Sequence, residues 1–387
     1  MTGALRRLVP RSLAMALLLT VLTSHIATAQ KRVGTFRDPD DGRVDLSDYL
    51  LTRKGFLPVP IIVTEPALGY GGGLAIAFFS QSLAEAAGGG TGKFVPPTIA
   101  VGGGFYTSDG SYGGVVGLFH PFRADRWRYV GALGGALLNL DFYGFDPEGP
   151  LADEPLSYTI EPLVLLQRLQ ARLAGTDLFV GGQYTYLRTT STFEADLPSE
   201  VPDRDLEVNL GGLGARLEYD SRDNLLDARR GLNISVNATW YDSAFGSDRA
   251  FGKYDVQGLF YGQPTTRWGY GLRVDTRLAS GDAPFFATPY LSMRGVASGE
   301  YMNDVTLLGE AELCFSIDSR WTVLGFGGAG RVGETLGDLG SVPTVGAGGA
   351  GFRYLLARRL GLGYGLDFAF GPGGDFALYI QTGAAWR

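Results

Sequence analysis

The sequence predicts an all-β fold, a transmembrane antiparallel β-barrel that occupies residues 57–387. Three observations predict it. Apolar residues alternate with polar or small residues through one segment after another, as side chains do on the two faces of a strand. These segments are often 11–15 residues long, about twice the usual strand of a soluble protein, and many carry an aromatic residue near one end. The chain also begins with an export signature, which makes an outer membrane reachable.

Residues 1–29 are predicted to be a cleaved signal peptide. Basic residues at Arg6, Arg7 and Arg11 precede an apolar stretch, and the small residues Ala27-Thr28-Ala29 follow it. A membrane anchor is the alternative, but the apolar stretch from Leu13 to Leu22 is short for a membrane-spanning helix. We therefore expect the mature chain to begin at Gln30.

Residues 30–56 differ in composition from the rest of the chain and are predicted to be a short segment ahead of the barrel. The run DPDDGRVD holds several carboxylates, but it lacks the spacing of a calcium-binding loop, so we expect a solvated turn. The following run VDLSDYLLTRKG predicts a short helix with Asp45 or Ser47 as its N-cap and Gly55 at its end. The segment is expected to lie in the periplasm or to plug the lumen.

Sixteen strands are predicted. Fifteen are clear from the alternation, and single-chain bacterial barrels have even numbers of strands. The sixteenth is 57–64, where Pro58 and Pro60 are tolerable only in a first strand at the barrel seam. The other predicted strands are 70–82, 96–107, 111–121, 126–143, 156–170, 177–191, 207–222, 230–242, 250–262, 267–280, 305–317, 320–332, 346–357, 360–370 and 375–387.

The alternation by itself fits two architectures. In 305–317, for example, Leu307 and Leu313 alternate with Glu310 and Glu312. A soluble sandwich would bury the apolar face between two sheets, whereas a membrane barrel turns it toward lipid and keeps a polar lumen. Strand length, the aromatic residues and the export signature favour the barrel. A barrel must also close, because open edges would leave backbone groups unpaired in hydrocarbon.

The connections are predicted to differ in length at the two ends of the barrel. In outer-membrane barrels the short turns face the periplasm and the long loops face outward. Tight turns are predicted at Asp109-Gly110, 317–321 and 357–360, and the long connections are 144–155, 192–206, 281–304 and 333–345.

Composition argues against several classes of function. Once the signal peptide is removed, the chain carries 30 basic and 40 acidic residues, which argues against binding to nucleic acid. The single cysteine, Cys314, cannot form an intrachain disulfide, and His120 is the one histidine left. The sequence has no G-x-S-x-G or H-E-x-x-H motif. We expect no catalytic residue, no metal and no cofactor.

Several segments, in order along the chain, resemble the barrels of BamA/TamA-type outer-membrane assembly and translocation proteins, also called bacterial surface antigens. The resemblance covers most of 57–387. It rests on LNLDFYGFD at 138–146, YDSRDNLLDARRGLNISV at 219–236, LGEAELCF at 308–315 and the last 42 residues, 346–387.

The resemblance implies a long loop that folds back into the lumen and is pinned by an Arg-Gly step. Here that step is Arg294-Gly295. The resemblance gives Arg294 an acidic partner in Glu312, and Glu310 lies on the same lumen face of the strand. A buried guanidinium needs such a partner, whereas a solvated loop arginine, the alternative, would contribute little. The family commonly has a second acid in the following strand, where this chain has Gly328.

Two further departures concern the ends of the barrel. Members of the family carry POTRA domains ahead of the barrel, and the 27 residues of 30–56 are too few for one, so a barrel-only member is expected. Such barrels usually end in an aromatic residue. Here Trp386 is penultimate, and the alternation puts it on the same face as Phe376 and Ile380, at the seam with Pro58 and Pro60.

The resemblance implies an outer-membrane protein that acts on clients, either outer-membrane or secreted proteins in an unfolded state. A weak seam between the first and last strands would part and pair with a client strand. Outer-membrane lipid is the other expected partner. The alternative is a passive channel or structural barrel with a plugged lumen.

Overall fold

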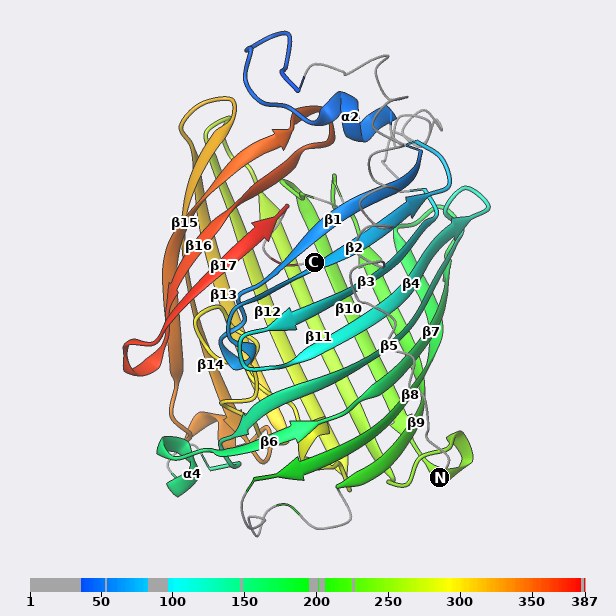
Figure 1. Ribbon diagram of the computed structural model, residues 1–387, viewed down its shortest axis with the longest axis vertical. Helices are drawn as coiled ribbons and strands as arrows, with labels where there is room; N and C mark the ends of the chain where they lie inside the picture. The colour runs from blue at the N-terminus through cyan, green and yellow to red at the C-terminus, as the bar shows by residue number, and fades with distance from the viewer. Residues whose placement is uncertain are drawn as a thin grey trace, which may run out of the picture.

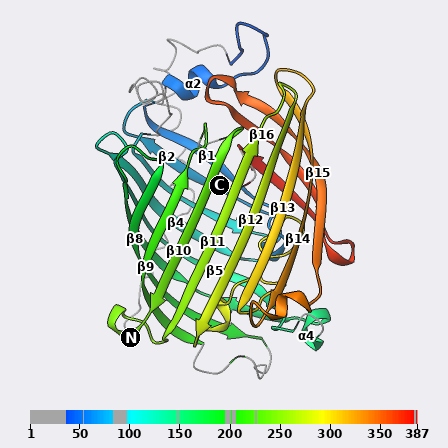
Figure 2. The same ribbon diagram turned by 180° about the vertical axis from the view of Figure 1, so that it is seen from behind.

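The strands of the computed structural model pair antiparallel in chain order and curve into a barrel (Figures 1 and 2). The structure describes residues 36–52, 54–82, 97–146, 149–194, 201, 206–224, 227–383 and 386. The predicted signal peptide, residues 1–29, lies outside this range. Among the described residues, no helix is long and apolar enough to cross a membrane.

The described residues form 17 strands and two short α-helices. The helices are α2 (Ser47–Thr52) and α4 (Pro150–Asp153). The strands are β1 (Gly55–Val63), β2 (Gly71–Phe79), β3 (Ile99–Thr107), β4 (Tyr112–Phe122), β5 (Trp127–Phe142), β6 (Leu156–Ile160), β7 (Leu163–Arg172), β8 (Leu178–Phe193), β9 (Glu207–Asp220), β10 (Gly231–Tyr241), β11 (Phe251–Gly262), β12 (Trp268–Gly281), β13 (Val305–Ser316), β14 (Trp321–Gly333), β15 (Val345–Ala357), β16 (Leu362–Phe370) and β17 (Phe376–Thr382).

These strands fill 16 positions around the wall, because β6 and β7 share one. Both pair with β5 on one side and with β8 on the other. Glu161 and Pro162 interrupt the strand between them, since a proline has no N–H to donate to a ladder. The Pro162 carbonyl still accepts a hydrogen bond from Ala136 N at 3.1 Å. The predicted fold class is confirmed. The 16 positions match the predicted count, although the predicted strand 156–170 is divided into β6 and β7.

The apolar faces of the strands point outward and the polar faces point into the lumen. In β13, Leu313 is 54% exposed, whereas Glu310 is 4% exposed. Large exposed apolar side chains recur on most of the other strands, including Leu74, Val116, Val180, Leu213, Val256 and Val274. A sandwich would have buried this face. The distribution is that of a barrel whose outer surface faces lipid.

The two ends of the barrel differ, and we call them the loop end and the turn end. The loop end carries α4 and the long connections, including residues 282–304, and lies at the bottom of Figure 1. The turn end carries α2 and tight turns such as 317–320 and 358–361, at the top of Figure 1. The tight turn at Asp109-Gly110 lies at the loop end instead, where Ser108 Oγ accepts a hydrogen bond from Tyr70 N at 3.1 Å. The connection between β9 and β10, at the turn end, is longer than predicted. It spans 221–230 and reaches the turn after β15, where Asn224 Nδ2 donates to the Leu360 carbonyl at 2.8 Å.

The first and last strands, β1 and β17, are the two edges of the sheet, and we call the boundary between them the seam (Figure 1). Within the described residues, no ladder pairing and no backbone hydrogen bond joins β1 to β17. Pro58 and Pro60 lie in β1, whose ladder with β2 is unbroken from Gly55 to Val63. The last strand, β17, has only 7 residues.

The position of Trp386 differs from the prediction. The alternation placed it on the same face as Phe376, which is 50% exposed, but β17 ends at Thr382 and Trp386 is 7% exposed. Its Nε1 donates to Glu310 Oε2 at 3.1 Å, inside the barrel. Extrapolating the alternation fails here because Trp386 lies beyond the last ladder pair, Tyr364 with Thr382. Beyond the ladder, a lumen carboxylate can accept the indole N–H, which lipid cannot do.

Candidate functional site in the barrel lumen

The connection between β12 and β13, residues 282–304, folds into the lumen, and we call it the inward loop. Leu291, Met293 and Val296 are buried, and they pack against Leu308 of β13 and Val332 of β14. The loop is closed on itself by a bridge between Tyr290 and Met302 and by Leu291 N, which donates to the Tyr301 carbonyl at 2.9 Å. Apolar packing therefore anchors the loop on the inner wall.

The Arg-Gly step forms a tight turn at the tip of this loop. Val296 N donates to the Met293 carbonyl at 3.1 Å, which closes the turn around Arg294 and Gly295. Gly295 has φ +94°, a conformation that glycine adopts without strain and that the third residue of a type II turn requires. The glycine thus sets the direction in which Arg294 points.

Arg294 reaches three carboxylates on the lumen wall. Its Nη1 donates to Glu312 Oε2 at 2.9 Å and to Asp367 Oδ2 at 2.9 Å. Its Nε lies 3.5 Å from Glu310 Oε1. The guanidinium carbon also lies 3.7 Å from the centre of the Phe326 ring, and the side chain is 7% exposed. The structure thus brings together all the residues that the resemblance grouped, Arg294, Gly295, Glu312 and Glu310.

Asp367, on β16, was not among the predicted site residues. It supplies the second acid that the resemblance implied on β14, where this chain has Gly328. A Cβ atom at Gly328 would lie 2.6 Å from Glu310 Cγ and 2.8 Å from Met293 Sδ, so the glycine makes room for both side chains. The sequence did carry a signal. Asp367 is the one charged residue in 360–370, and the alternation placed it on the lumen face.

Two more arginines share the same carboxylates. Arg273 Nη1 donates to Glu310 Oε2 at 2.9 Å and to the Ser292 carbonyl of the inward loop at 2.8 Å. Arg353 donates to both oxygens of Asp367, at 2.5 and 2.9 Å. Around the loop tip, three arginines therefore meet three acids. The attraction between opposite charges offsets the desolvation penalty of burying them.

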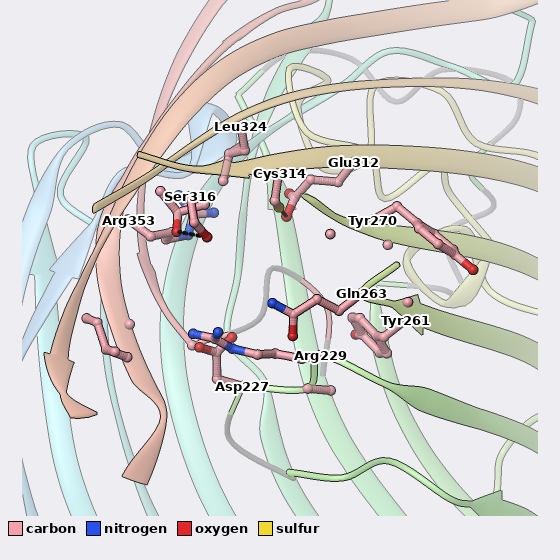
Figure 3. Close-up of a pocket in the computed structure, with 18 of the residues that line it drawn as sticks. Asp227, Arg229, Tyr261, Gln263, Tyr270, Glu312, Cys314, Ser316, Leu324 and Arg353 are labelled. Carbon is pink, nitrogen blue, oxygen red and sulfur yellow. Dashed lines mark hydrogen bonds between the residues drawn. The ribbon is translucent and has the colours of Figure 1, made fainter. Parts of the chain in front are cut away.

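A small pocket of about 120 Å³ lies between this network and the 221–230 turn (Figure 3). Tyr261, Tyr270 and Cys314 line it, and Cys314 Sγ lies 3.4 Å from Glu312 Oε1. Asp227 reaches into it from the turn (Figure 3). Within the described part of the chain, no three His, Cys, Asp or Glu side chains lie together so that they could hold a metal ion.

Burial raises the pKa of the Asp227 carboxyl to about 6, against an ordinary value near 3.9. Because the folded state holds this proton more tightly than the unfolded state, Asp227 favours folding below about pH 4 and loses that contribution as the pH rises to about 6. We therefore expect Asp227→Asn to stabilise the barrel at pH 8, by on the order of 2 kcal/mol more than at pH 4. Urea titration in lipid vesicles at both pH values measures this, and an equal effect at the two would contradict it.

No protein-family model matches the chain, and no curated protein matches its sequence. Solved structures do match. BamA from Haemophilus ducreyi lacking POTRA domains 1–3 has a TM-score of 0.56 at 10% identity, over 85% of this chain and 70% of that chain. CdiB from Escherichia coli has a TM-score of 0.58 at 12% identity, over 84% of this chain and 61% of that chain. CdiB from Acinetobacter baumannii has a TM-score of 0.52 at 12% identity, over 84% of this chain and 59% of that chain.

The chain has the barrel fold of BamA and CdiB. The predicted resemblance to BamA/TamA-type barrels is confirmed at the level of the fold. The chain spans less than two thirds of the length of either CdiB chain, so this likeness concerns the barrel alone.

In this BamA-like barrel, the inward loop contacts both edges of the seam. Gly295 N donates to the Tyr379 hydroxyl of β17 at 3.0 Å. Ser298 donates to Glu65 Oε1, which follows β1, from its backbone N at 3.2 Å and from its Oγ at 3.0 Å. The loop therefore links β17 to the connection that follows β1, from inside the lumen and at the loop end.

Proposed function

We propose that this protein is an outer-membrane barrel that helps client proteins insert into, or cross, the membrane by opening its seam. The clients would be outer-membrane or secreted proteins in an unfolded state. The observation that carries the proposal is the pair of edges at β1 and β17, which have no mutual ladder among the described residues. The fold shared with the BamA and CdiB barrels supports it. The proposal includes no catalytic step, metal or cofactor.

The edges are suited to transient pairing. An open edge offers a row of backbone donors and acceptors to a third strand. In β1, Pro58 and Pro60 stand at alternate positions and carry no N–H, so a ladder formed on that edge would lack donors. A client strand would therefore pair and leave again, rather than remain as a permanent strand of the wall.

Parting the seam requires the contacts of the inward loop to break or to move. The loop holds β17 through Tyr379 and the β1–β2 connection through Glu65, so the two edges separate at the loop end only when one of these is released. The hydrogen bonds to Tyr379 and Glu65 are few, each contributing about 1 kcal/mol, or somewhat more where a charge takes part. The Arg294 network, with three carboxylates, is the stronger anchor and would keep the loop on the wall during opening.

The experiment is an insertion assay with an internal lock. The mature protein, with Cys314→Ser, is reconstituted in liposomes, and the rate at which an unfolded barrel client becomes protease-resistant is measured. In a matched protein, cysteines replace Val59 of β1 and Ile380 of β17, and a bismaleimide cross-links these two cysteines across the seam. We expect acceleration by the free barrel, and loss of acceleration by the joined one. Steady conductance without acceleration, or equal acceleration by both, would overturn the proposal.

A passive channel is the second candidate, and a lumen cavity of about 490 Å³ favours it. Four cationic side chains line this cavity, against two carboxylates, although the chain as a whole is acidic: Arg168, Arg216, Lys253 and Arg277 face Asp255 and Asp275. Rings of Lys and Arg select anions in pores.

Any ion flow through this lumen is therefore expected to favour chloride over potassium. Lys253→Glu should shift the reversal potential in a KCl gradient toward the potassium potential, since it removes one positive charge from the cavity and adds one negative charge. Arg188→Glu is the matched control, because Arg188 is exposed in a pair with Glu207 outside the cavity. Equal shifts in the two variants would contradict a role for this cavity.

A further inference from the structure

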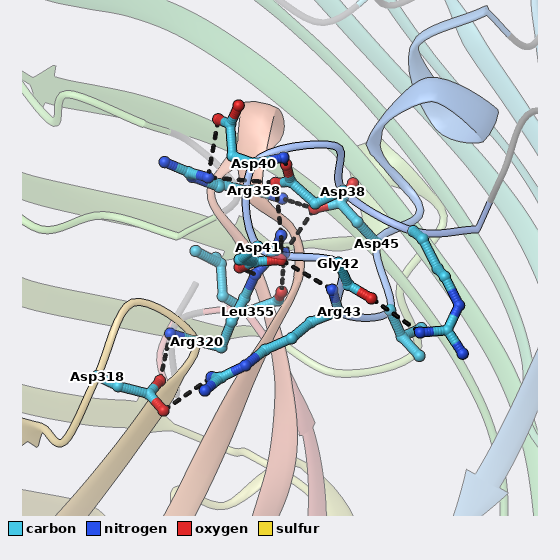
Figure 4. A network of polar contacts seen from close by, with 12 residues as sticks. Asp38, Asp40, Asp41, Gly42, Arg43, Asp45, Asp318, Arg320, Leu355 and Arg358 are labelled. Atoms are coloured by element: carbon cyan, nitrogen blue, oxygen red, sulfur yellow. Dashed lines mark hydrogen bonds and ion pairs between the residues drawn. The ribbon is translucent and has the colours of Figure 1, made fainter.

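The chain ahead of β1 is docked on the turn end of the barrel, and we call residues 36–52 the strap (Figure 4). It was predicted to be a solvated turn followed by a short helix. The helix is α2, as predicted, with Asp45 accepting a hydrogen bond from Ser47 N at 2.6 Å. The acidic run is docked on the barrel and is not the solvated turn that was predicted, because Asp38, Asp41 and Asp45 are bound to an arginine of the barrel.

The centre of the docking site is Arg320, in the turn between β13 and β14. Its side chain is 0% exposed, and it contacts three carboxylates of the strap. The distances are 2.5 Å to Asp38, 2.6 Å to Asp41 and 2.6 Å to Asp45. The hydrogen bond from Arg320 keeps the pKa of Asp41 below its ordinary value. A guanidinium surrounded in this way has few donors left for any other partner.

Further contacts extend the docking to the next hairpin. Arg358, in the turn between β15 and β16, contacts Asp38 at 3.3 Å and Asp40 at 3.2 Å (Figure 4). Backbone bonds add to these contacts, since Leu46 N donates to the Leu356 carbonyl at 2.8 Å. The strap is therefore fixed to β13–β16, which lie on the β17 side of the seam.

The α2 helix brings the two sides of the seam together in one apolar cluster. Leu51 is buried against Ala357 and Leu360, which lie at the turn between β15 and β16. Phe79, at the end of β2, packs against the same cluster. The β2 strand lies on the other side of the seam, next to β1. The cluster therefore joins the two sides of the seam at the turn end.

We propose that the strap is a latch that holds the seam shut at the turn end. It is bound to β13–β16, and only residues 53 and 54 separate α2 from β1. The three Cα–Cα steps from Thr52 to Gly55 span at most about 11 Å, a little over twice the spacing of adjacent strands. While the strap is docked, β1 cannot move far from the β17 side. The seam then opens first at the loop end, or opens fully only after Arg320 is released.

This latch is distinct from the inward loop, which links the edges at the opposite end of the barrel. The latch proposal does not depend on whether the seam serves client proteins, because it concerns only how far β1 and β17 can separate. A failure of the insertion assay would therefore leave it standing, and its own failure would leave the insertion assay unaffected.

Distances across the seam test the latch directly. Spin labels are placed at Phe56 and Thr382 for the turn end, and at Ile62 and Phe376 for the loop end, in the Cys314→Ser chain. Pulsed electron resonance then gives the distance distribution of each pair in lipid. The triple variant Asp38→Asn, Asp41→Asn and Asp45→Asn removes the three negative charges that surround Arg320. We expect the turn-end distribution to lengthen by about 5 Å, one strand spacing, with the loop-end pair unchanged.

A second variant keeps the strap intact. A protease site is inserted between Thr52 and Gly55 and cut after folding, so that the docked strap is no longer joined to β1. The latch predicts the same lengthening at the turn end. Asp48→Asn is the matched control, because this carboxylate is 57% exposed in its pair with Arg359 and its loss should change nothing. Unchanged turn-end distances in both the triple variant and the cut protein would overturn the proposal.

Discussion

Arg294→Ala is expected to free the inward loop from the lumen wall. The substitution leaves Glu312, Asp367 and Glu310 without the cation that they share, at a site where the side chains of Glu310 and Asp367 are 1% and 0% exposed. Removing one partner of a buried ion pair typically costs about 3–5 kcal/mol, because the remaining charge is left uncompensated. Protease added to folded barrels should cut within 282–304 in the variant and not in the parent.

The matched control is Arg188→Ala. Arg188 pairs with Glu207 at 3.7 Å, and the two side chains are 62% and 70% exposed, so the loss should be under about 1 kcal/mol. Urea titration of both variants in lipid vesicles gives the two free energies of unfolding. Unchanged loop protection in Arg294→Ala, or equal losses of stability in the two variants, would show that Arg294 does not pin the loop.

The barrel itself could be predicted from the sequence because its strands are long and their outer faces meet lipid. Each strand repeats the same two-residue alternation, so fold class and most strand positions follow from local pattern. The sixteenth strand, 57–64, rests instead on the even strand number of such barrels. The alternation fails where no ladder exists. Trp386 lies beyond the end of β17, and its side chain turns inward to Glu310. The strap was misjudged for a related reason, since its acidic run looks solvated until the partner turn with Arg320 is placed beside it.

The candidate site could be predicted only in part. Arg294, Glu310 and Glu312 are close in sequence, and the resemblance grouped them. Asp367 lies 73 residues from Arg294, and nothing local to either shows that β13 and β16 converge on the same loop tip. The reason for Gly328 was also hidden, because the crowding by Glu310 and Met293 exists only in the folded lumen. Residues that act through long-range contacts required the structure.

Asp367→Ala is expected to be about as damaging as Arg294→Ala, and to act at the seam. Asp367 is the shared acceptor of Arg294 and Arg353, at 2.9 and 2.5 Å, and its side chain is 0% exposed. Without it, two guanidinium groups lie close together with one acid fewer. We expect the free energy of unfolding to fall by about 3–5 kcal/mol. Because β16 carries β17 by its ladder, protease should gain access to 371–383 as well as to the inward loop.

Introducing an acid at position 328 tests whether the network requires only the negative charge of Asp367 or also its position. If net charge alone mattered, Gly328→Asp would rescue Asp367→Ala, since it restores the carboxylate on the neighbouring wall. The structure predicts no rescue, because a Cβ at 328 would lie 2.6 Å from Glu310 Cγ and 2.8 Å from Met293 Sδ. The double variant should therefore be no more stable in urea than Asp367→Ala. Recovery of parental stability would mean that Glu310 and Met293 can move aside, and that Gly328 is not a steric requirement.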